Sequence, residues 1–193
     1  MTNPAFYVDG EMERRIIDEM CGKKSPVRQV PNGDKVTIPV MAKKIATLMR
    51  LNTRYHPHII ITDREKRTET ADQMRQEMAK CLVKEGFKEK DFIIAIADRC
   101  IENWILADWE EAFRKKNITP APVKFTPADF GKDVIKQLLK ENHGSYNEPT
   151  IGKELFLSCR PQKLYDNDDN FRYLVNELKA IPFSCRWLDD ITL

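Results

Sequence analysis

Two unbroken apolar runs limit the folds open to this chain more than any other feature. Residues 58–63 contain three consecutive isoleucines, at 59–61, and residues 92–97 read Phe-Ile-Ile-Ala-Ile-Ala. A strand with one wet face would alternate apolar and polar residues, whereas a continuous run suits a strand covered on both faces, as in a parallel sheet. The two runs therefore predict an α/β protein whose parallel strands lie between layers of helices.

The segments around these runs complete an alternating pattern. Residues 4–9 and 27–30 read as two further short strands. Residues 11–21, 40–55, 70–84 and 101–115 place apolar side chains at helical spacing. The order β-α-β-α-β-α-β-α predicts a four-stranded parallel sheet sandwiched by helices, with right-handed crossovers.

The character of the sequence changes after residue 117. Prolines at 120, 122 and 127 resemble a linker, and the segments beyond them, 129–142, 151–158 and 170–181, are helical in pattern. We expect an α/β core over residues 1–117 and a helical C-terminal extension over residues 118–193, packed on that core.

Composition excludes several classes of protein. Lys plus Arg is 32 and Asp plus Glu is 30, so the net charge is +2, which argues against a polycationic arm that coats nucleic acid through bulk charge. No apolar run approaches the ~20 residues of a membrane helix, and the first residues do not resemble a signal peptide. Five widely spaced cysteines without a Cys-x-x-Cys pair predict reduced, buried thiols and a cytoplasmic location. The oligomeric state is left open.

Acidic residues follow three of the four predicted strands. Asp9 ends the first strand, Asp63 and Glu65 follow the third, and Glu102 begins the helix after the fourth; Glu13 lies in the helix after Asp9. Carboxyl ends of parallel strands share one edge, so neighbouring strands would bring these acids together. Clustered carboxylates repel one another unless they are protonated, neutralised or bound to a cation, and oxygen ligands suit Mg²⁺ or Mn²⁺. We expect Asp9, Asp63 and Glu65 to hold the metal.

Other roles are open to some of these residues. Arg64, Lys66 and Arg67 flank the acids and would either bind a phosphate or balance charge. Glu13 and Glu102 also suit the plain role of acids near helix N-termini.

Three segments resemble TOPRIM domains. These are Phe-Tyr-Val-Asp-Gly-Glu-Met-Glu-Arg at 6–14, Ile-Ile-Ile-Thr-Asp-Arg-Glu at 59–65, and Ile-Glu-Asn-Trp-Ile-Leu-Ala-Asp at 101–108. The third is similar to a signature of small TOPRIM-like bacterial proteins related to the RloB and OLD-type nuclease groups. The resemblance implies a divalent cation and phosphodiester chemistry. By position, Asp9 replaces a general acid/base glutamate, Asp63 and Glu65 replace the metal-binding aspartates, and Glu102 matches an acid of the third motif.

The favoured hypothesis is a Mg²⁺-dependent nuclease acting on nucleic acid. Asp9, Glu13 and Glu102 are its expected catalytic residues, and Arg64, Lys66 and Arg67 its phosphate contacts. Asp9 is one methylene shorter and Glu65 one methylene longer than the residues of the family pattern. Metal binding tolerates such changes in side-chain length better than positioned acid/base catalysis does. Analogy with the relatives suggests a role in defence against phage.

Two alternatives remain from the sequence. One is a non-catalytic interaction module that works with a separately encoded partner such as an ATPase, and the other is a phosphohydrolase of small phosphates. A stripe of Trp104, Trp109 and Phe113 would face such a partner, although its spacing is that of an ordinary buried helix face. His56 and His58, at the amino end of the third strand, are expected to be structural. The acidic patch of Asp166, Asp168 and Asp169 precedes a helix and is expected to cap it rather than to bind a metal.

Overall fold

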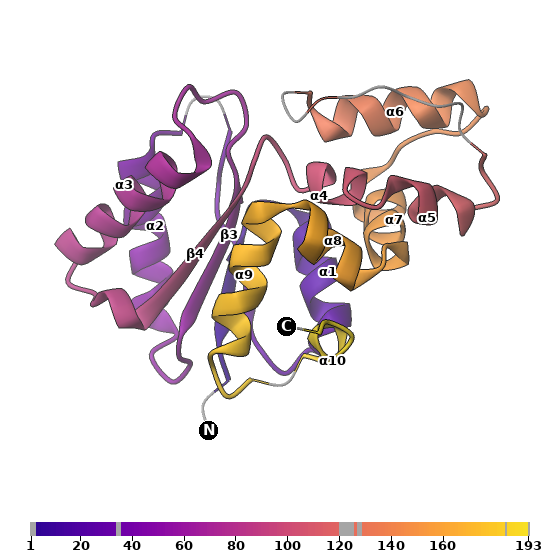
Figure 1. The fold of residues 1–193 in the computed structure, drawn as a ribbon. Helices are drawn as coiled ribbons and strands as arrows, with labels where there is room; N and C mark the ends of the chain where they lie inside the picture. The colour runs from indigo at the N-terminus through magenta and orange to yellow at the C-terminus, as the bar shows by residue number, and fades with distance from the viewer. Residues whose placement is uncertain (1–2, 34–35, 120–125, 127–128, 184, 193) are drawn as a thin grey trace.

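The computed structural model describes residues 3–33, 36–119, 126, 129–183 and 185–192. Its centre is a four-stranded sheet in the order β2-β1-β3-β4, with every neighbouring pair parallel (Figure 1). The strands are β1 (Ala5–Val8), β2 (Val27–Gln29), β3 (His58–Asp63) and β4 (Phe92–Ala97). The predicted parallel α/β architecture is confirmed, and β1, β3 and β4, the strands followed by acids, are neighbours.

One face of the sheet is covered by two long helices. α2 (Ile38–Leu51) and α3 (Ala71–Lys84) pack against each other and over side chains from alternate strand positions, among them Tyr7, Ile60 and Ile94. All six residues of β3 and of β4 are buried, which is why these strands read as continuous apolar runs.

The opposite face is covered by segments from both ends of the chain. Phe6, Ile59 and Ile93 point into this layer, where α1 (Glu11–Met20) and α9 (Asp169–Lys179) lie across the sheet. The C-terminal segment expected as an extension therefore contributes to the same continuous core as the strands.

The remaining described helical elements lie beside or beyond these layers (Figure 1). They are α4 (Glu102–Leu106), α5 (Trp109–Arg114), α6 (Gly131–Glu141), the π-helical turn η2 (Glu148–Gly152), α7 (Lys153–Ser158), α8 (Pro161–Asn167), α10 (Arg186–Asp189) and the 3₁₀ turn η1 (Glu89–Asp91).

Several sequence-based boundaries were wrong. The single helix expected over residues 101–115 is two helices, because the chain breaks at Ala107 and Asp108. α2 ends at Leu51, four residues before the expected end, and α8 and α10 were not predicted. The linker prolines 120, 122 and 127 lie outside the described residues.

Several residues have the structural roles that the sequence predicts. His58 opens β3 at the amino edge, where Tyr7 Oη lies 2.9 Å from its Nδ1. Asp168 Oδ1 accepts a 2.8 Å hydrogen bond from the N–H of Phe171 and caps α9. Trp104 and Phe113 are buried and Trp109 is half-buried, as expected for core packing. Four cysteines are buried, but Cys81 is half-buried, because it lies at the margin of the apolar face of α3.

Candidate functional site

The carboxyl edge of the sheet joins Asp9 directly to Asp63. β1 and β3 are adjacent, with Val8 opposite Ile61, so the residues that follow each strand meet at this edge. Asp9 Oδ2 accepts a 2.5 Å hydrogen bond from the backbone N–H of Asp63. The first two predicted metal ligands therefore come together.

Asn32 and Arg67 fix the Asp9 carboxylate from the loops beside it. The Nδ2 of Asn32 lies 2.8 Å from Asp9 Oδ2 and 2.8 Å from the carbonyl oxygen of Asp63. Arg67 Nη2 donates to Asn32 Oδ1 over 2.6 Å, which sets the orientation of the amide. One carboxylate oxygen of Asp9 is thus fully engaged, while Oδ1 is buried and has no partner among the described residues.

Glu13 is the most unusual acid of the site. Its side chain is 7% exposed, and Oε2 has no hydrogen-bond partner among the described residues. The carboxyl folds back over Gly10, where a Cβ would stand 2.6 Å from Oε2, so glycine leaves the space that this carboxyl occupies. Burial, with the nearby charges of Asp9 and Glu102, raises the pKa of Glu13 to about 8.

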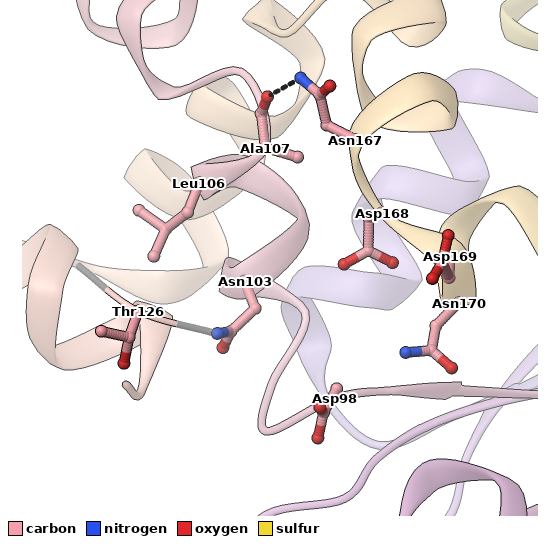
Figure 2. A pocket seen from close by; sticks show the side chains of 9 residues that line it. All are labelled: Asp98, Asn103, Leu106, Ala107, Thr126, Asn167, Asp168, Asp169 and Asn170. Atoms are coloured by element: carbon pink, nitrogen blue, oxygen red, sulfur yellow. Dashed lines mark hydrogen bonds between the residues drawn. The ribbon is translucent and has the colours of Figure 1, made fainter. Parts of the chain in front are cut away.

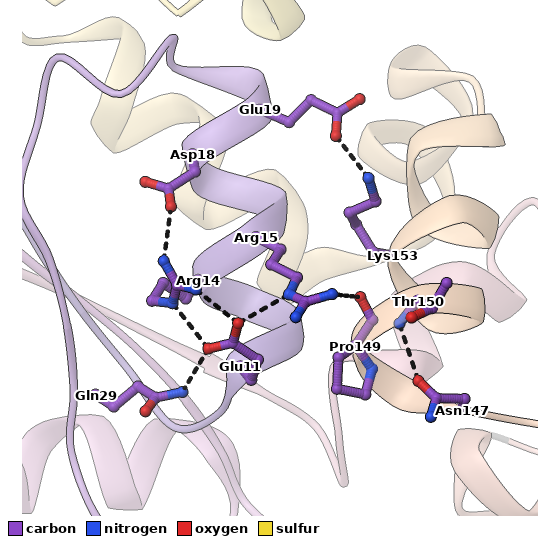
Figure 3. A network of polar contacts seen from close by, with 10 residues as sticks. All are labelled: Glu11, Arg14, Arg15, Asp18, Glu19, Gln29, Asn147, Pro149, Thr150 and Lys153. Carbon is purple, nitrogen blue, oxygen red and sulfur yellow. Dashed lines mark hydrogen bonds and ion pairs between the residues drawn. The ribbon is translucent and has the colours of Figure 1, made fainter.

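Glu11, two residues earlier on α1, shows the opposite environment (Figure 3). It accepts from Arg14 Nη2 over 2.6 Å and from Arg15 Nε over 2.8 Å, and these bonds lower its pKa to about 2. The same helix therefore carries one acid neutralised by arginines on its outer face and one buried acid turned towards the sheet edge.

The other acids belong to the same cluster. Burial raises the pKa of Asp63, and the charges of Asp9, Glu13, Glu102 and Glu65 raise it further. The pKa of Asp9 rises to about 6, mainly through burial, against its hydrogen bonds, and with a contribution from Glu65. The five carboxyls expected to meet at this edge therefore influence one another electrostatically.

Tyr146 ties Glu102 to the helical layer. Its hydroxyl donates a 2.7 Å hydrogen bond to Glu102 Oε1. Gly152 makes room for that ring, since a Cβ there would stand 2.5 Å from the Tyr146 hydroxyl oxygen and would also collide with Met12. Tyr146 comes from the C-terminal segment, so that segment completes the surroundings of the acids.

The basic residues beside the acids have different surroundings. Arg64 is buried: its Nε contacts Asp98 Oδ1, and its Nη1 donates to the carbonyl of Arg67 over 2.7 Å. Arg67 is engaged with Asn32, whereas Lys66 is exposed. Two of the three predicted phosphate contacts therefore brace the loop after β3.

The donor atoms of the carboxylate cluster suit a divalent cation. It offers oxygen donors alone, which suits Mg²⁺ or Mn²⁺, and buried oxygens of Asp9 and Glu13 lack partners, as expected for groups left over for a ligand. Within residues 3–33, 36–119, 126, 129–183 and 185–192, however, no three acidic, histidine or cysteine side chains are already arranged as a metal-binding group. The donors fit the cation in chemistry and would adjust their rotamers to bind it.

A separate cavity of about 340 Å³ has Asp98 in its wall (Figure 2). It separates α4 from the start of α9, and it is lined largely by asparagines and aspartates, including Asn103, Asp168 and Asn170. Asp9, Glu13 and Asp63 are not part of its wall, so the cavity is distinct from the carboxylate cluster.

Sequence reasoning identified the acids but missed their partners. Asn32 and Tyr146 each lie in a loop, far in sequence from the acids that they contact. The turn Pro-Asn-Gly-Asp at 31–34 signals a loop, but not that its asparagine reaches Asp9.

Comparison with protein families gives one match. The family model described as Domain of unknown function (DUF4276) covers residues 11–179, which is most of the chain. The chain belongs to this family. The DUF4276 match includes Glu13, Asp63, Glu65 and Glu102, together with Tyr146 in the C-terminal segment, and begins two residues after Asp9. Searches of the curated proteins and of the solved structures returned no match. In the described part of the chain, no helix combines the length and apolar character needed to span a membrane.

Proposed function

We propose that the protein is a Mg²⁺- or Mn²⁺-dependent nuclease whose site is the carboxylate cluster at the carboxyl edge of the sheet. The observation that carries the proposal is the convergence of acids from three adjacent strands, with buried oxygens of Asp9 and Glu13 that have no hydrogen-bond partner within the described ranges. Burying like charges together is costly, and a divalent cation offsets that cost. The sequence resemblance to TOPRIM domains favours phosphodiester hydrolysis over other uses of such a cation.

The residues divide into three proposed roles. Asp9, Asp63 and Glu65 would hold the cation, which when bound polarises a phosphoryl oxygen and stabilises the leaving oxygen. Glu13, with a pKa raised to about 8, carries a proton at neutral pH and is suited to give it to a leaving oxygen. Glu102 is held by Tyr146 and is suited to orient water.

Metal binding is tested by calorimetric titration of the purified chain with Mn²⁺ and Mg²⁺, alongside cleavage of labelled oligonucleotides. Wild-type protein should bind Mn²⁺ and cut, whereas Asp63→Asn should do neither. Asp169→Asn is a matched control, because that side chain is 90% exposed and lies on α9. No heat of binding at millimolar metal would overturn the proposal and favour the interaction module.

Melting temperatures and cleavage rates distinguish a role of Glu13 in the site from a role in folding alone. Glu13→Gln removes a buried acid that faces like charges, so it should raise the melting temperature of the metal-free protein. The same variant should still gain stability from Mn²⁺, because Asp9, Asp63 and Glu65 would hold the cation, but it should cleave far more slowly, because it has no acidic proton to give. If Glu13→Gln lowers stability and cleaves like wild type, Glu13 has no part in the site.

A further inference from the structure

Two cations beside the carboxylate cluster share one aromatic ring. The Cζ of Arg99 lies 5.4 Å, and the Nζ of Lys66 6.0 Å, from the centre of the Phe130 ring. Neither cation forms an ion pair with any described residue, and Arg99 Nε is buried without a hydrogen-bond partner. The carboxylate next to Arg99, Asp98, is instead occupied by Arg64.

The backbone holds this arrangement at the edge of the sheet. Arg99 has φ of 70° and Glu65 has φ of 57°, conformations that non-glycine residues seldom adopt. The N–H of Glu65 donates to the carbonyl of Arg99 over 2.7 Å, so the loops after β3 and β4 lock each other. Such strain persists where surrounding structure enforces it, and it is common at functional sites.

Phe130 is held just as firmly. Asn103 Nδ2 donates to the carbonyl of Asp129 over 2.9 Å, and its Oδ1 accepts from the N–H of Gly131 over 3.0 Å. These bonds bracket Phe130 and fasten it to the first turn of α4, which also carries Glu102. The ring and its two cations are thus fixed beside the acids.

We propose that Arg99 and Lys66, held over Phe130, bind backbone phosphates of a nucleic-acid strand; the inference deepens the proposed function and rests on it for the identity of the strand. Lys66 and Arg99 are paired with no carboxylate in the described part of the chain, and cations of this kind at the rim of an acidic site counter its repulsion of a polyanion. Phosphate contacts of this kind position a strand without reading its sequence. Arg64 and Arg67, already engaged within the protein, are not needed for this contact.

The test measures strand binding without metal. Anisotropy of labelled single-stranded DNA and RNA of about 20 nucleotides, longer than usual single-strand site sizes, is titrated in EDTA. Arg99→Gln and Lys66→Gln should each weaken binding roughly 5- to 10-fold. Each lost contact should also make the slope of log K against log salt concentration shallower by about 0.7. Arg54→Gln is the matched control, since Arg54 lies 4.9 Å over Tyr55 at the other end of the sheet, and should bind like wild type.

The outcomes separate this inference from the nuclease proposal. Wild-type affinity in both Arg99→Gln and Lys66→Gln, or no strand binding by the wild type, overturns the inference even where Mn²⁺-dependent cleavage is observed. Binding that depends on both residues supports it even where no cleavage occurs. If inorganic phosphate displaces the labelled strand as effectively as unlabelled strand does, the ligand is a small phosphate and the assignment to a strand is contradicted. Lys66→Gln keeps the test valid if Arg99→Gln fails to fold, because Lys66 is exposed.

A second inference concerns two buried cysteines. Cys21 ends α1 and Cys185 precedes α10, and their Sγ atoms lie 2.8 Å apart. A disulfide bond is about 2.05 Å long, so the sulfur atoms need to move by less than about 1 Å to bond. We infer that Cys21 and Cys185 are a modification site that oxidises to a disulfide and fastens the C-terminal segment to α1.

The oxidant can be a small disulfide such as oxidised glutathione. One cysteine thiolate attacks it and releases a glutathione thiol; the second cysteine then attacks the mixed disulfide and releases the other, so two protein thiols are oxidised as one disulfide is reduced. The two thiols are buried, so the exchange is expected to need partial opening of the C-terminal segment.

Intact-mass measurement and peptide mapping test this inference. After oxidation, wild-type protein should lose two hydrogens, yield a Cys21–Cys185 linked peptide, and melt roughly 10 °C higher than the reduced form. Cys21→Ser should abolish all three changes, whereas Cys159→Ser, another buried cysteine, should preserve them. Failure of the wild type to form the linked peptide, including after oxidative refolding from denaturant, would contradict the inference.

Discussion

The hydroxyl of Tyr146 donates a 2.7 Å hydrogen bond to Oε1 of Glu102. This bond joins the acid that follows β4 to a residue of the C-terminal segment. Gly152 and Met12 pack against the same tyrosine, so the contact is supported from two further elements. The acid cluster is therefore completed by tertiary packing rather than by the strands alone.

Tyr146→Phe should remove this bond while keeping the ring. We expect a loss of about 1–3 kcal/mol in the free energy of unfolding, because the buried carboxyl of Glu102 loses its donor. Under the nuclease proposal, cleavage should fall while metal-free strand binding stays unchanged. Urea denaturation and the anisotropy assay check both. Tyr165→Phe, which removes a 3.0 Å bond from a tyrosine to Asn176 at the exposed side of α8, should cost less.

Alanine should cost much more stability at one glycine than at another. At Gly131 a Cβ would stand 2.5 Å from the backbone nitrogen of Asn103 and 2.6 Å from the carbonyl carbon of Glu102, neither of which can move independently. Gly131→Ala should therefore cost about 2–3 kcal/mol, as α6 lifts from α4. At Gly10 the clash is with the end of the Glu13 side chain, and φ of −133° suits alanine.

Gly10→Ala should therefore cost less than about 1 kcal/mol, since the Glu13 carboxyl can swing away. Under the nuclease proposal it should still slow cleavage, because the Glu13 carboxyl leaves its position over residue 10. Urea denaturation of both variants, with the cleavage assay for Gly10→Ala, measures the contrast. Equal losses of stability in the two variants would contradict the assigned causes.

The sequence supports the fold best where burial is complete. β3 and β4 were predicted with their observed bounds, because strands buried on both faces cannot alternate polar and apolar residues. The break between α4 and α5 was missed because apolar side chains keep helical spacing across it. At the break, Asp108 has a non-helical backbone and its side chain contacts Arg160, a tertiary contact that periodicity does not encode.

The positions of the site residues could also be predicted only in part. Acids that directly follow strands could be placed, because parallel strands end at one edge. Asn32 and Tyr146 could not be placed, since their positions depend on how loops and the C-terminal segment fold back. The role of Arg64 was also beyond the sequence: the same spacing serves a phosphate contact or an ion pair with Asp98.

Asp108 anchors the C-terminal segment. Its side chain is 3% exposed and accepts from Arg160 through the backbone N–H at 2.7 Å and Nε at 3.0 Å. Asp108→Ala should cost about 1–2 kcal/mol, because it removes these charge-assisted bonds while the Arg160 side chain, which is 51% exposed, can turn to water. Asp108→Asn retains an acceptor and should cost less. Chemical denaturation measures both, and no loss in the alanine variant would show that the segment is anchored elsewhere.

His58 should make stability depend on pH. Burial, aided by the neighbouring His56, lowers the pKa of His58 to about 4 from an ordinary value of 6.5. The unfolded chain therefore binds a proton between these values that the folded protein excludes. Stability from this group is complete above pH 6.5 and falls by up to about 3 kcal/mol as the pH drops towards 4.

Urea denaturation between pH 4 and 7 measures this effect. His58→Asn places an oxygen near the position of Nδ1, where it can accept from Tyr7, and it does not titrate. This variant should lose the part of the pH dependence due to His58. Tyr7→Phe should instead lower stability by a similar amount at every pH, because it removes the hydrogen bond and leaves the buried imidazole in place. An unchanged slope in His58→Asn would assign the pH dependence to other groups.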